Sequence, residues 1–208
     1  MTTDQGGQQH GLTANAIGLG GDIIVAVANV APSSAVAFTL ALLLTLTGLA
    51  VGADAVFVAL HLAGNPGNLG TIIRTASAAG AAGVILIGPS ADPYDPAAVK
   101  ASMGALFTVP VATAGYAAEF LDWAQRGGVR VAATSARGSV TCWQADLAPP
   151  LAILLGSEGS GLPDGLLAAA DLRVAIPMTG TAESLNLAVA AGVLLYEVRR
   201  RGWPGAAP

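Results

Sequence analysis

AVFVALHLAGNPGNLGTIIRTASAAGAAGVILIG, residues 55–88, is the stretch that decides the fold. It opens with an apolar run at 55–60 that is rich in β-branched residues, which predicts a buried strand. A Pro-Gly turn follows, then a small-residue segment at 69–79 that predicts a helix, and then a second apolar strand at 83–88. Strand, helix and strand in this order are typical of a sheet whose strands run parallel.

The rest of the chain repeats the same alternation. A loop with a short helix is predicted at 92–104, further helices at 116–127, 162–170 and 182–200, and further strands at 107–111, 129–135, 151–156 and 172–178. Because each strand is a continuous apolar run, both of its faces are expected to be buried. The sequence therefore predicts an α/β fold in which a parallel sheet is covered by helices on both faces.

The composition limits the kinds of site that the chain can build. Its 208 residues suit one ordinary domain, and only 11% are charged against about 25% in average soluble domains. The net charge of −4 argues against a broad basic face for nucleic acid, although a small local one remains open. The only cysteine is Cys142 and the two histidines, His10 and His61, are far apart, so no disulfide and no metal site is expected.

The first 53 residues differ in character from residues 54–208. Residues 1–21 are polar and are expected to be disordered, whereas 23–53 contain no charged residue and include an apolar helix long enough to cross a bilayer, about 20 residues. This helix could be a membrane span, a helix packed on the domain or a remnant of a gene fusion, and it resembles the first membrane helix of an amino-acid permease. A cytoplasmic protein is expected, with membrane association through 23–53 as the alternative.

Polar residues gather in the loops that follow four of the predicted strands. The segments that hold them contain Asn68 and Arg74, Thr134 and Ser135, Glu158 within GSEGSGL (156–162), and Ser184 and Asn186 within IPMTGTAESLN (176–186). Ligands of parallel α/β sheets bind beyond the carboxyl ends of the strands, so these loops form the candidate site. Each residue also has a local explanation: a surface ion pair for the arginine, helix capping for the serine and asparagine, and turn formation for the glycines.

Three of these stretches resemble the successive motifs of the SpoU/TrmH family of RNA 2′-O-ribose methyltransferases, in the SPOUT superfamily. They are NPGNLGTIIRTASAAGAAGVIL (65–86), GSEGSGL (156–162) and IPMTGTAESLNLAVAAGVLLYE (176–197). KASMGALFTVPV (100–111) is similar to the family segment between the first two, and the resemblance covers about 55–201. It implies a C-terminal trefoil knot, S-adenosylmethionine as cofactor, a homodimer and an RNA substrate, with ribosomal RNA favoured over transfer RNA.

The resemblance also implies roles for individual residues. The catalytic set would be Arg74, Asn68, Glu158, Ser184 and Asn186; the cofactor would contact Thr134, Ser135, Gly156, Ile176 and Leu185; and RNA would contact Arg74, Lys100 and Arg137. A positioned arginine can stabilise the negative charge that develops on a ribose 2′-oxygen. It stays protonated in proteins, so charge stabilisation is preferred here to direct action as a base.

The chain departs from the family in its first 53 residues. Many family members carry an N-terminal RNA-binding domain there, whereas this segment contains no Lys or Arg. The alternatives are therefore a catalytically impaired RNA-associated binding module and a membrane-associated fusion that carries the domain at 54–208. The run Arg199–Arg201 could contact RNA or complement the dipole at the end of the last helix.

Overall fold

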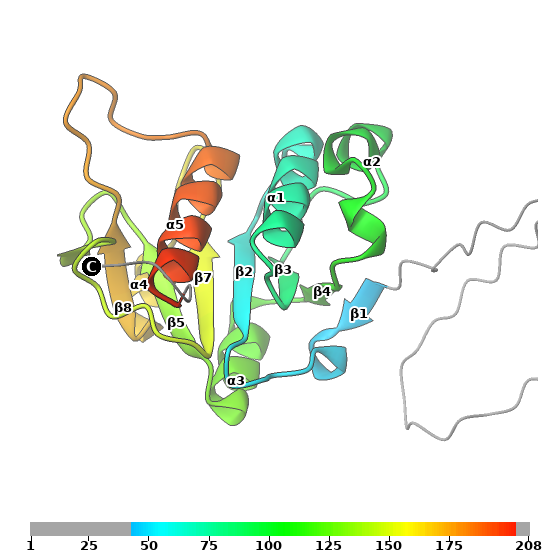
Figure 1. Ribbon diagram of the computed structural model, residues 1–208, viewed down its shortest axis with the longest axis horizontal. Helices are drawn as coiled ribbons and strands as arrows, with labels where there is room; N and C mark the ends of the chain where they lie inside the picture. The colour runs from blue at the N-terminus through cyan, green and yellow to red at the C-terminus, as the bar shows by residue number, and fades with distance from the viewer. Residues whose placement is uncertain (1–42, 203–208) are drawn as a thin grey trace, which may run out of the picture.

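The computed structural model describes residues 43–202 (Figure 1). The strands are β1 (Leu43–Thr45), β2 (Val56–His61), β3 (Gly83–Ile87), β4 (Val111–Ala114), β5 (Arg130–Thr134), β6 (Val140–Thr141), β7 (Leu151–Leu155) and β8 (Leu172–Ala175). The α-helices are α1 (Pro66–Ala78), α2 (Pro96–Ser102), α3 (Ala117–Gly127), α4 (Asp164–Ala169) and α5 (Leu187–Gly202), with short 3-10 helices η1 (Leu46–Gly48) and η2 (Ala105–Phe107).

All eight described strands join one parallel sheet in the order β1-β4-β3-β2-β7-β5-β8-β6. The predicted α/β architecture is thereby confirmed. In the centre of the sheet, β2 pairs with β3 on one side and with β7 on the other. The loops after β2 and β7 therefore begin side by side at the carboxyl edge of the sheet.

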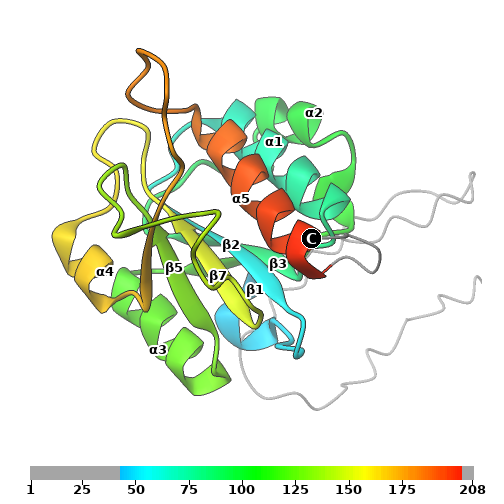
Figure 2. The same cartoon turned by 60° about the vertical axis from the view of Figure 1, so that its left-hand side comes forward.

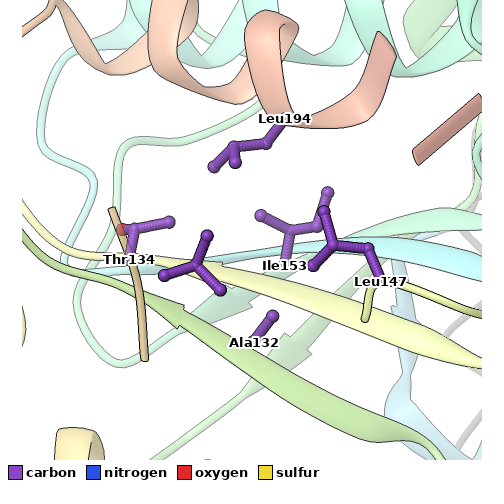
Figure 3. Close-up of a pocket in the computed structure, with 6 residues that line it drawn as sticks. Ala132, Thr134, Leu147, Ile153 and Leu194 are labelled. Carbon is purple, nitrogen blue, oxygen red and sulfur yellow. The ribbon is translucent and has the colours of Figure 1, made fainter. Parts of the chain in front are cut away.

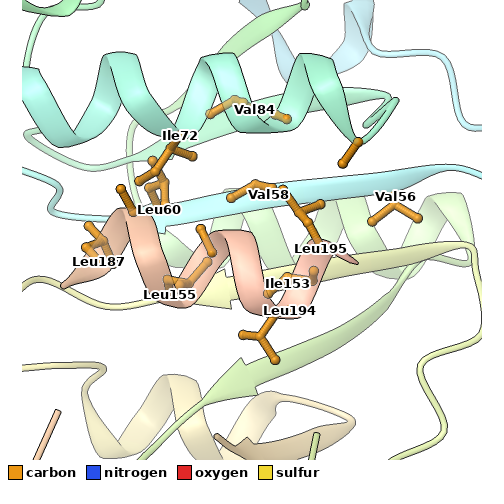
Figure 4. Close-up of a cluster of buried hydrophobic side chains, with 14 of the residues drawn as sticks. Val56, Val58, Leu60, Ile72, Val84, Ile153, Leu155, Leu187, Leu194 and Leu195 are labelled. Carbon is orange, nitrogen blue, oxygen red and sulfur yellow. The ribbon is translucent and has the colours of Figure 1, made fainter. Parts of the chain in front are cut away.

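Helices cover both faces of the sheet, as the continuous apolar strands require (Figures 1 and 2). On one face, α1 and α5 pack on β2 and β7, and their side chains interdigitate with alternate strand residues such as Val58, Leu60 and Ile153 (Figure 4). On the other face, α3 and α4 enclose a second core that contains Phe57 and Trp123, whose rings meet edge to face at 5.1 Å.

The chain between α2 and β4 differs from its predicted structure. A strand was predicted at 107–111, but residues 105–107 form η2 and the strand begins only at Val111. Pro110 has no N–H to give to a ladder, and its carbonyl accepts from Val84 N, so regular pairing starts after it.

The last helix also begins later than predicted. It starts at Leu187 rather than at 182, because the side chain of Asn186 accepts the backbone N–H groups of Ala188 and Val189 and so caps the helix at that point. The two-residue strand β6 was not predicted at all, since a segment this short leaves no periodic pattern.

Residues 43–53 contain the strand β1 and the 3-10 helix η1 rather than the apolar helix that the sequence predicted. β1 extends the sheet beyond β4, and Leu46 and Leu49 are buried against the α3 side of the core. No helix within 43–202 is long and apolar enough to cross a membrane. Residues 1–42, where the disordered segment and most of the predicted span fall, lie outside the described residues.

The loop between β5 and β7 contacts the C-terminal part of the chain at two places. At one end, Gly138 packs so tightly on β8 that a Cβ there would lie 2.5 Å from Ala175 N. At the other end, Arg201 of α5 donates to the carbonyls of Cys142 and Trp143 and to that of Ala145. These contacts are compatible with a threaded C-terminus, and the trefoil knot itself stays a prediction.

Candidate functional site

Three predicted residues from three distant segments meet at the carboxyl edge of the sheet. The amide of Asn186 donates to Asn68 Oδ1 at 3.1 Å and to Glu158 Oε1 at 3.3 Å. The amide of Asn68 also donates to Glu158 Oε1. Glu158 and Asn186 are exposed and Asn68 is half-buried, so this polar cluster faces solvent.

Local sequence explains how the two asparagines are held. Asn65 caps α1 by accepting the N–H of Asn68, and Pro66 occupies the first helical position, where its missing N–H is not needed. Asn186 caps α5 with its oxygen, which leaves its amide free to donate into the cluster. Both clustered asparagines thus sit at helix amino ends, where the helix dipole favours a negative group such as the Glu158 carboxylate.

Glu158 lies on a narrow hairpin whose shape depends on glycine. Gly161 N donates to Ser157 O, and a Cβ on Gly156 would lie 2.2 Å from the carbonyl carbon of Gly161. Gly156 is therefore needed for close approach within the hairpin, which is the turn-forming explanation of this glycine. The hydroxyls of Ser157 and Ser160 are 2.7 Å apart and close the hairpin next to Glu158.

Arg74 is not brought into this cluster within one chain. It lies on the exposed side of α1 and forms no hydrogen bond or ion pair with any residue from 43 to 202 for which contacts are described. Six residues correspond to about 1.7 helical turns, so its side chain leaves α1 about 120° around the axis from that of Asn68. Ser184 is also exposed, in the segment before α5, and its side chain has no hydrogen-bond partner within that same part of the chain.

The residues predicted to contact the cofactor follow β5, β7 and β8. Ser135 N donates to Val174 O, which ties the ends of β5 and β8 together, and the Ser135 hydroxyl accepts the N–H of Arg137. Ile176 is half-buried after β8 and Leu185 is 37% exposed just before the cap of α5. Exposed apolar side chains beside backbone polar groups fit an adenosine, whose base needs both.

Thr134 lies somewhat deeper than the other predicted contacts. It lines a gap between the sheet and α5 together with apolar residues (Figure 3). The gap is lined by Ala132, Thr134, Leu147, Ile153, Val174 and Leu194. It is too narrow to admit water, so it is a packing defect of the core rather than a ligand site.

The nine basic residues divide sharply according to their partners, and all of them lie within the described chain. Six bind protein acceptors: Arg126, Arg130, Arg173, Arg199, Arg200 and Arg201. The side chains at 199–201 are thus occupied by contacts within the fold. Arg199 binds the end of α1, and Arg201 binds the loop between β5 and β7. Arg74, Lys100 and Arg137, the three predicted RNA contacts, are exposed and their side chains have no acceptor among residues 43–202.

The described residues hold no group of three potential metal ligands. Asn65 follows the first predicted strand together with Asn68 and Arg74, but no role was predicted for it, although it positions Asn68. An asparagine directly before proline at a helix start was the available signal.

Comparison with known proteins places this geometry in context. Residues 55–196 match the sequence model of the SpoU rRNA Methylase family. The chain is 39% identical over 142 residues to the 23S rRNA (uridine(2479)-2′-O)-methyltransferase of Streptomyces viridochromogenes, an alignment that covers 66% of this chain and 50% of the relative. The chain spans about half the length of the curated relatives it matches.

Solved structures of RNA methyltransferases also resemble this chain. An AdoMet-bound rRNA methyltransferase from Sinorhizobium meliloti superposes with a TM-score of 0.73 at 42% identity, covering 76% of this chain and 61% of that one. A structure described as giving insight into 2′-OH methylation of C/U34 on tRNA superposes with a TM-score of 0.67 at 35% identity. That alignment covers 72% of this chain and 97% of the tRNA-related one.

Proposed function

The chain belongs to the SpoU rRNA methylase family, and from that premise we propose that it is an S-adenosylmethionine-dependent RNA methyltransferase acting on a ribose 2′-hydroxyl. The observation that carries the proposal is the cluster of Asn68, Glu158 and Asn186, gathered from three motifs at one edge of the sheet. Ribosomal RNA is favoured over transfer RNA, because the curated relative and the AdoMet-bound structure described above both carry ribosomal RNA in their names.

The proposed chemistry divides between the cofactor and this chain's own residues. S-adenosylmethionine supplies an electrophilic methyl group on a sulfonium. The loops after β5, β7 and β8, with Thr134, Ser135, Gly156, Ile176 and Leu185, would hold the adenosine and exclude water. The cluster would then orient the ribose, with Glu158 fixing the two asparagine amides and the Ser184 hydroxyl close by.

Arg74 is proposed to stabilise the 2′-oxygen as it loses its proton and develops negative charge. Guanidinium remains charged at any working pH and suits this role better than that of a base. Because Arg74 and the cluster do not meet within one chain, its delivery requires a second chain or a movement on RNA binding.

A homodimer is proposed to supply that contact. The outer side of α5 exposes Val189 (51%), Val193 (37%) and Tyr196 (51%), which follow one another at helical spacing. α1 packs beside α5, with Thr75 Cγ2 lying 3.5 Å from a Cβ built at Gly192. If this apolar stripe on α5 forms the dimer interface, the neighbouring helix α1 would bring Arg74 of one subunit near the polar cluster of the other.

The test is ribose-methylation mapping of ribosomal and transfer RNA from cells with and without the gene, combined with assays of the purified full chain. We expect one 2′-O-methyl site to disappear with the gene and to be restored by the purified protein with S-adenosylmethionine. If the protein bound RNA and cofactor but transferred no methyl group, the rival function of a catalytically impaired binding module would hold instead.

A further inference from the structure

The carboxyl edge of the sheet continues beyond the catalytic cluster, over the ends of β2, β3 and β4. Leu62, Gly88, Gly115 and Tyr116 follow these strands, and together they are called the β2–β4 rim here. Leu62 N donates to Ile87 O and Gly88 N donates to Ala114 O, so the strand ends lie in adjacent positions across the sheet. The rim lies on the same edge of the sheet as the cluster, and Leu62 is three residues before Asn65, the cap of the helix that carries Asn68.

Leu62 adopts a conformation that needs an explanation. Its φ is +55°, in the left-handed region where a leucine is strained, and its side chain is 37% exposed. Strained residues of this kind cluster at ligand sites, since the fold retains them in spite of their cost. The side chain leans over Gly88, where a Cβ would lie 3.0 Å from Leu62 Cδ2.

The other side of the rim carries an aromatic ring. Tyr116 is 66% exposed and stands at the cap position of α3, although its side chain makes no capping bond. Between Leu62 and Tyr116 the strand ends are Gly88 and Gly115, so no side chain of theirs fills the space. Glu119 lies under this part, and its Oε2 accepts Gly115 N at 2.7 Å.

The chemistry of the rim suits a nucleobase better than a phosphate. An exposed leucine and an exposed tyrosine offer apolar and aromatic contact to a flat ring, and the nearby carboxylate can accept from an exocyclic amino group but repels an anion. Three cations have no acceptor among residues 43–202, so uncharged contacts would have to supply much of the RNA affinity.

We propose that the β2–β4 rim is a second nucleotide subsite, which stacks an unpaired, amino-bearing base close in the RNA to the methylated ribose. This subsite rests on the proposed RNA methyltransferase function and extends it to the recognition of the substrate. It predicts preference for single-stranded RNA with cytosine, adenine or guanine beside the target over uracil.

The full-length protein provides the test, with fluorescent hexacytidylate and hexauridylate as probes. Leu62→Gly removes the side chain while glycine accepts the positive φ, so its melting temperature should not fall. Tyr116→Ser removes the ring and supplies a better helix cap. Tyr116→Ser should bind hexacytidylate about tenfold more weakly, because stacking of one base on an aromatic ring is worth about 1–3 kcal/mol. Leu62→Gly should also weaken this binding, because the apolar contact of the leucine with the base is lost. Tyr116→Phe should restore the binding.

Trp143→Ala is the matched control, since Trp143 is 62% exposed but lies on the loop held by Arg201 at the far end of α5. It should leave hexacytidylate binding unchanged. Wild-type affinity in both rim variants, or equal affinity for the two probes, would overturn the subsite. Binding of S-adenosylmethionine and methylation of ribosomal RNA by the wild-type chain are measured in parallel. Their absence would count against the proposed function, whereas their presence with unaffected rim variants would count against the subsite alone.

Discussion

The amide of Asn186 donates to Asn68 Oδ1 at 3.1 Å, although 118 positions separate the two residues in the chain. The same asparagine caps α5 with its oxygen. One side chain therefore serves the helix and the cluster through different atoms, and these two roles can be separated by substitution.

Asn186→Asp should keep the helix cap, because a carboxylate oxygen accepts the N–H of Ala188 as well as an amide oxygen does. It would place a carboxylate against Asn68 Oδ1 and Glu158, so methyl transfer should fall at least about tenfold, the loss expected for about 1.4 kcal/mol. Asn186→Ala should lose the activity and about 1 kcal/mol of unfolding free energy as well. Chemical denaturation and initial methylation rates measure the two effects, and a fully active Asp variant would exclude Asn186 from the cluster's function.

Arg74→Ala should reduce the single-turnover rate of methyl transfer by about 10²- to 10³-fold, the range seen when one charge-stabilising donor is removed. Its unfolding free energy should stay within about 0.5 kcal/mol of the wild type, since the side chain is exposed and has no acceptor in the described chain. Arg126→Ala, which loses only an exposed pair with Asp122, is the control for removal of a positive charge. Equal activity of the two variants would rule out the role proposed for Arg74.

Arg201→Ala should destabilise the protein by about 2–3 kcal/mol, because a partly buried guanidinium that binds three loop carbonyls and Glu197 is lost. Arg200→Ala should cost less than about 1 kcal/mol, since Arg200 is 59% exposed and contacts only Glu197. Urea denaturation of both variants provides the comparison. Equal losses would mean that the loop contacts contribute nothing measurable.

The pKa of Glu197 is held below its usual value, chiefly by the hydrogen bond from Arg200 and further by Arg201, although burial acts in the opposite direction. A carboxyl group whose pKa is lowered in the folded state stabilises the protein above its unfolded pKa of about 4.3. That contribution is lost as the pH falls through the lower folded pKa. Urea denaturation at a series of pH values should therefore show a shallower loss of stability for Glu197→Gln than for the wild type below about pH 4.3.

Leu46→Ala should destabilise the fold by about 2–4 kcal/mol, because Leu46 is 3% exposed within the core on the α3 side. Thr47→Ala, at the exposed neighbouring position, should change the unfolding free energy by less than about 1 kcal/mol. Thermal unfolding of the full chain checks both values. If Leu46→Ala were neutral, residues 43–53 would be an appendage of the domain rather than part of its core.

Much of the fold could be predicted because its strands are continuous apolar runs, as at Val56–Leu60 and Leu151–Leu155, and each is bounded by turn residues. The edge elements could not be predicted in this way. The composition of residues 43–49 predicts an apolar helix. The segment instead forms a strand and a 3-10 turn because it pairs with the edge of β4 that β3 leaves unpaired. Local periodicity carries no information about a partner strand more than 60 residues away.

The candidate site was predicted to a similar extent and with similar limits. Asn68, Glu158 and Asn186 were predicted from their place after strands and from the family resemblance, and the structure brings them together. The separation of Arg74 from this cluster was not predicted, although the six-residue spacing on a helix already places its side chain about 120° around the axis from that of Asn68. Arg199 and Arg201 likewise donate to backbone carbonyls that are distant in sequence, and no local sequence pattern indicates such tertiary contacts.

α1 and α5 are fastened together at both of their ends. At the sheet edge the fastening is Asn68 to Asn186, and at the other end Arg199 donates to the carbonyls of Ala79 and Gly80, just past the last turn of α1. Asn186 and Arg199 are 13 residues apart, which is about 20 Å along a helix, so two cross-links at this separation prevent the pair from pivoting at either one. The two helices should therefore move as one rigid body. A displacement of Asn68 and Asn186 should be transmitted in full to the other ends of α1 and α5.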